Sequence, residues 1–163
     1  FIKTYDEHVD DINRFIYFKI GNREDANDLT SIVFLKAWDY INQNSLKDSN
    51  TLRALFYKIA RTSIADYYRS QKNQHSLSLD DEENPIDVID EGQDALEQTA
   101  INSDLELIRK KLPELKMEYR EVIIMHYVND LSLEEISEIT GKKKSNLRVL
   151  LYRALKALRE TIE

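Results

Sequence analysis

Cysteine is absent from the 163 residues, and glycine and proline are scarce, with three and two residues. The lack of cysteine excludes disulfides and thiolate metal sites. Tight turns depend on glycine and proline, so their scarcity argues against a sheet-rich fold. Hydrophobic residues make up 42% of the chain and charged residues 33%, which is the composition of a globular protein. These numbers predict an all-α protein.

Long apolar runs are also missing, and none approaches the roughly 20 residues that a membrane-spanning helix needs. The first residues, FIKTYDEHVDD, do not follow the basic-then-apolar pattern of a signal peptide. The histidines His8, His75 and His126 have no HExxH spacing, and no glycine-rich phosphate loop is present. We therefore expect a cytoplasmic protein without membrane insertion, without a metal or cofactor, and without enzymatic activity.

Charge is unevenly distributed along the chain, whose formal net charge is −7. Residues 1–41 carry a net −3 and residues 76–106 a net −11, whereas residues 42–75 carry +4 and residues 107–163 carry +3. Exposed charges more than about 8 Å apart are largely screened at physiological salt, so each segment presents its own surface. The acidic total therefore does not exclude basic, nucleic-acid-binding surfaces.

Apolar residues recur at helical spacing in the first part of the chain. Three amphipathic helices of this length can bury a shared core. A polar loop, NQNSLKDSN (42–50), separates the second helix from the third. The predicted helices cover roughly residues 1–20, 23–41 and 51–72.

Composition changes abruptly in the middle of the chain. The segment 76–97 is strongly acidic and contains no Lys or Arg. Such a segment cannot offset its ordering entropy by burial, so it is predicted to be a flexible linker. Helical spacing resumes near Ala95. The predicted organisation is two small helical domains, residues 1–75 and residues 98–163, joined by this acidic linker.

The stretch LSLEEISEITGKKKSNLRVLLYRALKAL has the pattern of a helix-turn-helix. Ser132 and Glu135 are spaced as a capping box at the start of a short helix, and Gly141 supplies the left-handed residue that ends it. Beyond the turn, leucines at intervals of three and four face inward and leave the polar residues outward. From Gly141 to Arg159 there are seven basic residues and no acidic one.

The outward residues of this second helix are candidates for DNA contacts, because such a helix enters the major groove by its amino-terminal end. Lys and Arg meet phosphates, and side chains at the leading end of the helix read base edges. Arg148 suits a guanine edge and Asn146 an adenine edge. The alternative interpretation is a solvated basic face. The candidates are Lys142, Lys143, Lys144, Ser145, Asn146, Arg148, Val149, Tyr152 and Arg153.

Both halves of the chain resemble one known family, the bacterial sigma factors. LPELKMEYREVIIMHYVNDLSLEEISEITG, followed by LLYRALKALRE, resembles their fourth region. REDANDLTSIVFLKAW and RALFYKIARTSIADYYRSQK resemble their second region. The two regions in this order, joined by a short acidic linker, are similar to the extracytoplasmic-function (ECF) group. The resemblance implies a subunit that takes core RNA polymerase to promoters, and commonly an anti-sigma partner.

The resemblance also implies roles for residues that match the family motifs. The fourth region would read the minus-thirty-five element of double-stranded promoter DNA. The second region would bind core polymerase, made of beta and beta-prime subunits, through Asp25, Asp28, Leu29, Val33 and Phe34. It would recognise and melt the minus-ten element through Asn42, Asn44, Asn50, Arg53, Tyr57, Lys58, Arg61 and Arg69.

Several of these roles have a purely structural alternative. Leu29 and Val33 suit a core as well as an interface, whereas Asp25 and Asp28 favour a contact. At Val149 the chain departs from the usual Ser of the family, so the promoter sequence does not follow from the resemblance. Two other functions remain open from the sequence: a stand-alone helix-turn-helix repressor, and a regulator that binds polymerase without reading DNA.

Overall fold

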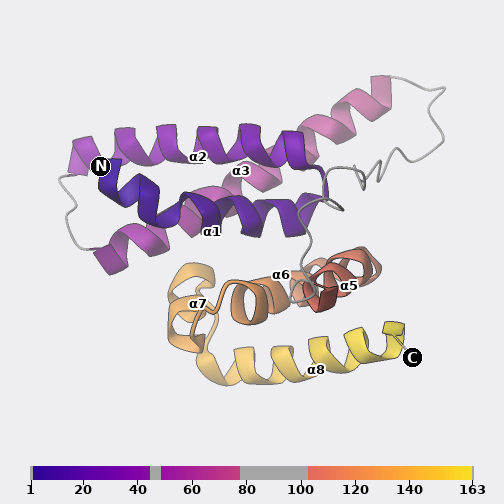
Figure 1. Cartoon of the computed structure of the whole chain (residues 1–163). Coiled ribbons are helices and arrows are strands. Elements are labelled where there is room, and N and C mark those ends of the chain that lie inside the picture. Colours follow the sequence, from indigo (N-terminus) through magenta and orange to yellow (C-terminus); the bar gives the residue numbers. More distant parts are fainter. Residues whose placement is uncertain (1, 45–48, 78–102, 163) are drawn as a thin grey trace. The chain divides into compact units, whose positions relative to one another are not determined.

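The computed structural model describes residues 2–44, 49–77 and 103–162, and these residues form helices and no strand (Figure 1). The prediction of an all-α protein is confirmed. The chain divides into two compact units, residues 1–89 and residues 90–163. Among the described helices, none combines the length and the apolar composition needed to cross a membrane.

The first unit is the predicted bundle of three helices, each of which packs against the other two. Its turn between the first two helices follows from Gly21 and Asn22. Gly21 adopts φ +78°, a conformation that L side chains rarely adopt. The side-chain oxygen of Asn22 accepts a hydrogen bond of 2.9 Å from the backbone N–H of Asp25 and so caps the second helix. The helices are α1 (Ile2–Ile20), α2 (Arg23–Asn44) and α3 (Ser49–Leu77).

Aromatic rings fill the centre of the first unit. The ring centroids of Phe34 and Phe56 are 4.7 Å apart, and Phe15 meets Tyr57 edge to face at 5.2 Å. All four rings are buried. Aromatic pairs contribute about 0.5–1.5 kcal/mol beyond the burial of their area. The cluster takes rings from all three helices and therefore holds them together.

The second unit is built from short helices that lead into one long helix. Its core is aliphatic, with Leu112, Ile123 and Ile136 fully buried. The helix α6 packs against α8, and α7 also packs against α8. The elements are α5 (Ser103–Lys111), the 3-10 turn η2 (Leu112–Glu114), α6 (Met117–Ile123), the π-helical turn η3 (Ile124–Val128), α7 (Leu133–Thr140) and α8 (Lys144–Ile162).

The π-helical turn η3 continues α6 with a wider turn. The N–H of Asn129 donates to the carbonyl of Ile124, five residues back, at 2.9 Å. Asp130 follows with φ +56°, and the chain changes direction there after the end of the helix. Nδ1 of His126 lies 2.9 Å from the carbonyl oxygen of Leu131. Because a carbonyl only accepts, this ring nitrogen carries the proton, and His126 is a hydrogen-bonded structural histidine.

The helix-turn-helix of α7 and α8 has the predicted caps. The hydroxyl of Ser132 accepts the N–H of Glu135 at 3.1 Å, and the Glu135 carboxylate accepts the N–H of Ser132 at 3.0 Å. Gly141 ends α7 at φ +78°, and its N–H donates to the carbonyl of Ser137 at 2.8 Å. An N-cap of this kind contributes about 0.5–2 kcal/mol. The caps fix where α7 begins and ends, and so where α8 starts.

Helix boundaries differ from the predictions around the polar loop. Asn42 and Asn44 lie in the last turn of α2, not in a loop, and the side chain of Asn44 donates to the carbonyl of Tyr40 at 2.9 Å. No Gly or Pro interrupts the helix there. At the other end of α3, the helix continues through Leu77, two residues past the predicted domain limit. The rest of the predicted linker, and the helical spacing predicted near Ala95, lie outside the described residues.

Candidate nucleic-acid and protein interfaces

The outward face of α8 is basic, and its inward face is apolar. Leu147, Ala154 and Leu158 are buried against the rest of the second unit. The predicted DNA-contact residues on the helix lie on the other side, which confirms the predicted phase. Six of them are exposed: Ser145, Asn146, Arg148, Val149, Tyr152 and Arg153.

The lysines at the start of α8 differ from the arginines farther along. Nζ of Lys144 lies 3.0 Å from a carboxylate oxygen of Glu134 on α7. Lys142, in the turn, has its Nζ 4.0 Å from Glu118. Lys142 and Lys144 are half-buried, whereas Lys143 is exposed. Within residues 103–162, Arg148 has no ion pair or hydrogen bond from its side chain, and neither has Arg153. The arginines can bind an anion without first breaking an internal contact.

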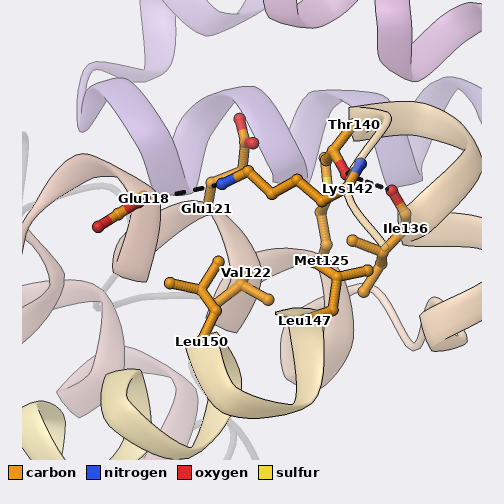
Figure 2. Close-up of a pocket in the computed structure, with 9 residues that line it drawn as sticks. All are labelled: Glu118, Glu121, Val122, Met125, Ile136, Thr140, Lys142, Leu147 and Leu150. Atoms are coloured by element: carbon orange, nitrogen blue, oxygen red, sulfur yellow. Dashed lines mark hydrogen bonds and ion pairs between the residues drawn. The ribbon is translucent and has the colours of Figure 1, made fainter. Parts of the chain in front are cut away.

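A small pocket lies where the turn meets α6. Figure 2 shows the Lys142 side chain crossing this pocket toward Glu118. Beside it, a groove of about 290 Å³ is lined by residues of α6 and α8, among them Tyr119 and Val149. The remaining residues around the small pocket are mostly apolar: Val122, Met125, Ile136, Leu147 and Leu150, with Glu121 and Thr140 at the edge.

Three of the residues predicted to bind polymerase have side chains in the core of the first unit, which is the structural alternative left open for Leu29 and Val33. Leu29 is 8% exposed, Val33 is 0% exposed and Phe34 is 4% exposed. They face inward because they share the helical phase of Ala26 and Ala37, which are also buried. A side chain in this position packs in the core of the first unit.

The outward face of α2 carries apolar residues that the sequence prediction missed. Leu35 is 66% exposed, Trp38 is 42% exposed and Ile32 is 40% exposed. Asp28, a predicted contact residue, is exposed four residues before Ile32, on the same face. Large apolar side chains gathered on one outward face are typical of a protein interface. The available signal was that α2 carries apolar residues on nearly every side.

Asp25 has a role inside the first unit. Its carboxylate accepts a hydrogen bond of 2.6 Å from the hydroxyl of Tyr67 on α3. Gln71 donates to the same hydroxyl oxygen at 2.7 Å. Burial, and then this hydrogen bond, raise the pKa of Tyr67 above its ordinary value. Asp25, which the sequence favours as a contact residue, therefore also joins the start of α2 to α3.

The residues predicted to bind the minus-ten element are divided between surface and core. Tyr57 is 1% exposed, so it packs in the aromatic cluster and cannot stack on a base. Asn42 and Asn44 are exposed at the end of α2, and Asn50 lies in the first turn of α3. The remaining basic residues on α3 are exposed or half-buried: Lys58 and Arg69 are exposed, and Arg53 and Arg61 are half-buried.

No group of three or more His, Asp or Glu residues in the described part of the chain is placed to hold a metal ion. The surfaces that remain are the basic face of α8, the apolar face of α2 and the basic residues of α3.

Two family models match the chain, one to each unit. The model "Sigma-70 region 2" matches residues 4–74, and the model "Sigma-70, region 4" matches residues 105–158. The chain belongs to the sigma-70 family. Like other sigma factors, it binds core RNA polymerase and directs promoter-specific initiation of transcription. Sigma factors are initiation factors and not enzymes.

Similar proteins place this sigma factor in the ECF group. RNA polymerase sigma factor SigV of Bacillus subtilis is 32% identical over 94% of this chain and 85% of the relative. ECF RNA polymerase sigma factor SigW of the same organism is 28% identical, over 99% of this chain and 88% of the relative. The sigma factor RpoE of Bartonella quintana, solved in complex with the anti-sigma factor NepR, has the same fold. Its TM-score is 0.80 at 23% identity, over 99% of this chain and 96% of that one. Nothing in these comparisons supports the alternative of a stand-alone repressor.

Proposed function

We propose a division of labour between the described surfaces of this sigma factor. The face of α8 reads the minus-thirty-five element, the face of α2 binds core polymerase, and α3 binds the minus-ten element. The observation that carries the proposal is the acid-free stretch from Gly141 to Arg159 in a chain of net charge −7. Its basic side chains lie opposite the buried leucines of α8, so they are presented to a polyanion.

On α8, the proposed contacts divide by position. Ser145, Asn146 and Arg148 lie in the first two turns and address base edges in the major groove. Lys143 and Arg153 contact phosphates. Tyr152 is 69% exposed and lies one turn beyond Arg148, where it contacts the sugar-phosphate backbone of the DNA. Lys142 and Lys144 can join these contacts only by leaving Glu118 and Glu134, at 4.0 Å and 3.0 Å.

The docking surface proposed for core polymerase is the outward face of α2. Asp28, Ile32 and Leu35 follow one another at intervals of four and three residues and are all exposed. A contact with a beta or beta-prime subunit removes this apolar area from water, at about 25 cal/mol per Å² buried. The buried residues Leu29, Val33 and Phe34 pack α2 against the core beneath that surface.

The minus-ten contacts are proposed for the exposed side of α3 and the end of α2. Lys58 and Arg69 are exposed and attract phosphates of the melted strands. Asn42 and Asn44 carry amides that can pair with the edge of an unstacked base. Arg53, Arg61 and Asn50 complete the proposed set. Tyr57 is left out because it is buried.

An anti-sigma factor is a further proposed partner. The structural relative RpoE was solved in complex with one. The apolar face of α2 suits such a partner as well as it suits polymerase, so the two would compete for it. We place the protein in the cytoplasm, where polymerase and promoter DNA lie, and propose that it acts without catalysing a reaction.

In vitro transcription tests the proposal as a whole. The purified chain, bacterial core polymerase and a library of genomic DNA fragments are combined, and the 5′ ends of the transcripts are sequenced. Defined start sites that are absent with core polymerase alone are expected, with a shared element upstream of them. A folded chain that directs polymerase to no start site contradicts the proposal.

A further inference from the structure

The outward face of α8 carries one exposed aliphatic side chain in its first two turns, Val149, among polar and basic neighbours. At 100° per residue, Ser145, Val149, Tyr152 and Lys156 fall in one row opposite the buried Leu147. Val149 is 50% exposed. Its isopropyl group is thus held outward by the helix, in the middle of the face proposed to enter the major groove.

The neighbours of Val149 are polar and reach farther than it does. Arg148 lies on one side of the central row, and Asn146 and Arg153 lie on the other. Val149 is the sixth residue of α8 and belongs to its first two turns. In a helix-turn-helix, residues in this part of the second helix contact base edges. An apolar side chain here is set close to the bases while its longer neighbours reach phosphates and flanking base pairs.

The chemical groups that base pairs expose in the major groove determine which base Val149 can contact. A valine neither donates nor accepts a hydrogen bond, and it leaves any donor or acceptor that it covers unpaired. The apolar group that base pairs present in the major groove is the C5 methyl of thymine. We propose that Val149 reads a thymine of the minus-thirty-five element by packing against this methyl group. The inference rests on the proposed placement of α8 in the groove.

Removing the methyl group from DNA tests this proposal without altering the protein. The full chain is assembled with core polymerase, and sites are selected from duplexes with a randomised minus-thirty-five region. Each thymine of the selected site is then replaced by deoxyuridine, and binding of the holoenzyme is measured by competition. One replacement is expected to weaken binding about three- to fivefold, the effect of burying one methyl group.

Three variants locate the effect on the protein. Val149→Ala should bind the thymine and deoxyuridine duplexes equally, because alanine is too short to reach the methyl group. Val149→Thr, which keeps one methyl of the isopropyl group, should retain a preference for thymine. Ile162→Ala is the matched control: Ile162 is also a β-branched side chain, 47% exposed, at the far end of α8, and its removal should change nothing.

The proposal is overturned if deoxyuridine is tolerated at every position, or if Val149→Ala keeps the same penalty as the parent chain. The second result is expected if Val149 instead contacts a protein at the groove between α6 and α8. Arg148→Ala separates this failure from that of the proposed function. If it relaxes promoter selection while Val149→Ala does not, α8 still reads DNA and only the thymine contact is wrong. If neither variant alters selection, the placement of α8 is wrong as well.

Discussion

The two units differ in what their functional helices expose. On α2, Leu35 and Trp38 are more than 40% exposed although both are large and apolar. On α8, the outward side chains include Arg148 and Arg153, and neither is engaged by a carboxylate within the described second unit. An apolar face suits a partner that removes it from water, whereas a cationic face suits a polyanion. This difference supports the proposal that α2 binds protein and α8 binds DNA.

This difference has a measurable consequence for salt. Binding through α8 should weaken steeply as salt rises, because each neutralised phosphate releases counterions. Binding through α2 should change much less, since burial of apolar area does not depend on screening. Substitutions that alter one surface at a time can therefore test whether α2 binds protein and α8 binds DNA.

The largest effect is expected from Leu35→Glu on α2. A charge at the centre of an apolar interface should weaken binding to core polymerase by about 2–4 kcal/mol, as at a hot spot. The measurement is the Kd of the labelled chain for core polymerase by fluorescence anisotropy. Leu107→Glu is the control, because Leu107 is a leucine of the second unit with 42% exposure. An equal loss of affinity for core polymerase in both variants would show that the outward face of α2 is not the docking surface.

Arg148→Ala on α8 comes next. Loss of a bidentate contact to guanine should cost about 1–3 kcal/mol at the minus-thirty-five element and relax selectivity there. Holoenzyme binding to a selected promoter and to its single-base variants measures both effects. Arg159→Ala removes an exposed arginine from the last turn of the same helix and should preserve selectivity. A uniform loss over all sequences would reassign Arg148 to phosphate binding.

Tyr67→Phe is expected to destabilise the first unit by about 1.5 kcal/mol, because it removes a hydrogen bond to a carboxylate. Urea unfolding can be followed by the fluorescence of Trp38, the one tryptophan, which lies in this unit. Tyr40→Phe is the control, since Tyr40 is 45% exposed on α2. If the two variants unfold alike, the bond between Asp25 and Tyr67 contributes nothing to stability.

Glu134→Gln should strengthen DNA binding slightly. It releases Lys144, now 3.0 Å from the carboxylate, to meet a phosphate. The expected gain is about two- to threefold at low salt, with the salt slope steeper by about 0.9 for one further phosphate contact. Binding of holoenzyme across a salt series measures both quantities. Glu138→Gln removes an exposed carboxylate of α7 that has no ion pair in the described residues. A steeper salt slope for Glu138→Gln as well would indicate that the effect comes from net charge and not from the ion pair between Glu134 and Lys144.

The smallest effect concerns pH. Burial lowers the pKa of His8 below 6.5, and the positive charge of Arg53 lowers it further, against the opposing Glu7 and Asp11. The folded state therefore favours the neutral ring. This contribution to stability is present above pH 6.5 and is lost as pH falls through the folded pKa.

His8→Phe tests the direction of this pH dependence of stability. Phenylalanine keeps a ring against Phe56, where the His8 ring now lies with its centroid 5.4 Å away. Unfolding of the first unit, followed by Trp38 fluorescence, should lose less stability between pH 7.5 and pH 5.5 than in the parent chain. A parent and a variant with the same pH dependence would show that His8 does not titrate with folding.

The helix-turn-helix could be predicted from the sequence because its signals agree. Ser132, Glu135 and Gly141 mark the caps, and leucines and basic residues fall in opposite helical phases. The structure reproduces all of these features. The binding roles of the outward residues stay predictions, since exposure alone does not identify a ligand.

The first unit was harder to predict because large apolar residues also occur on the exposed, mostly polar side of α2. Val33 and Leu35 are both large and apolar, yet one is fully buried and the other is 66% exposed. Periodicity cannot rank two such faces, and the choice depends on how α1 and α3 pack. Tyr57 was misassigned for a related reason, since an aromatic residue suits a core and a base stack equally well. The π-helical turn η3 was also missed, because helical spacing does not signal one wider turn.

That turn makes one stretch of the second unit sensitive to chain length. In η3 the hydrogen bond from Asn129 spans five residues where an α-helix spans four. Removing a single residue would restore the regular helix and rotate everything after it by about 100° per residue lost. Related chains can therefore change side chains here, but an insertion or a deletion would shift the start of the next helix. Alignments of this region should place gaps after Asp130 and not inside the turn.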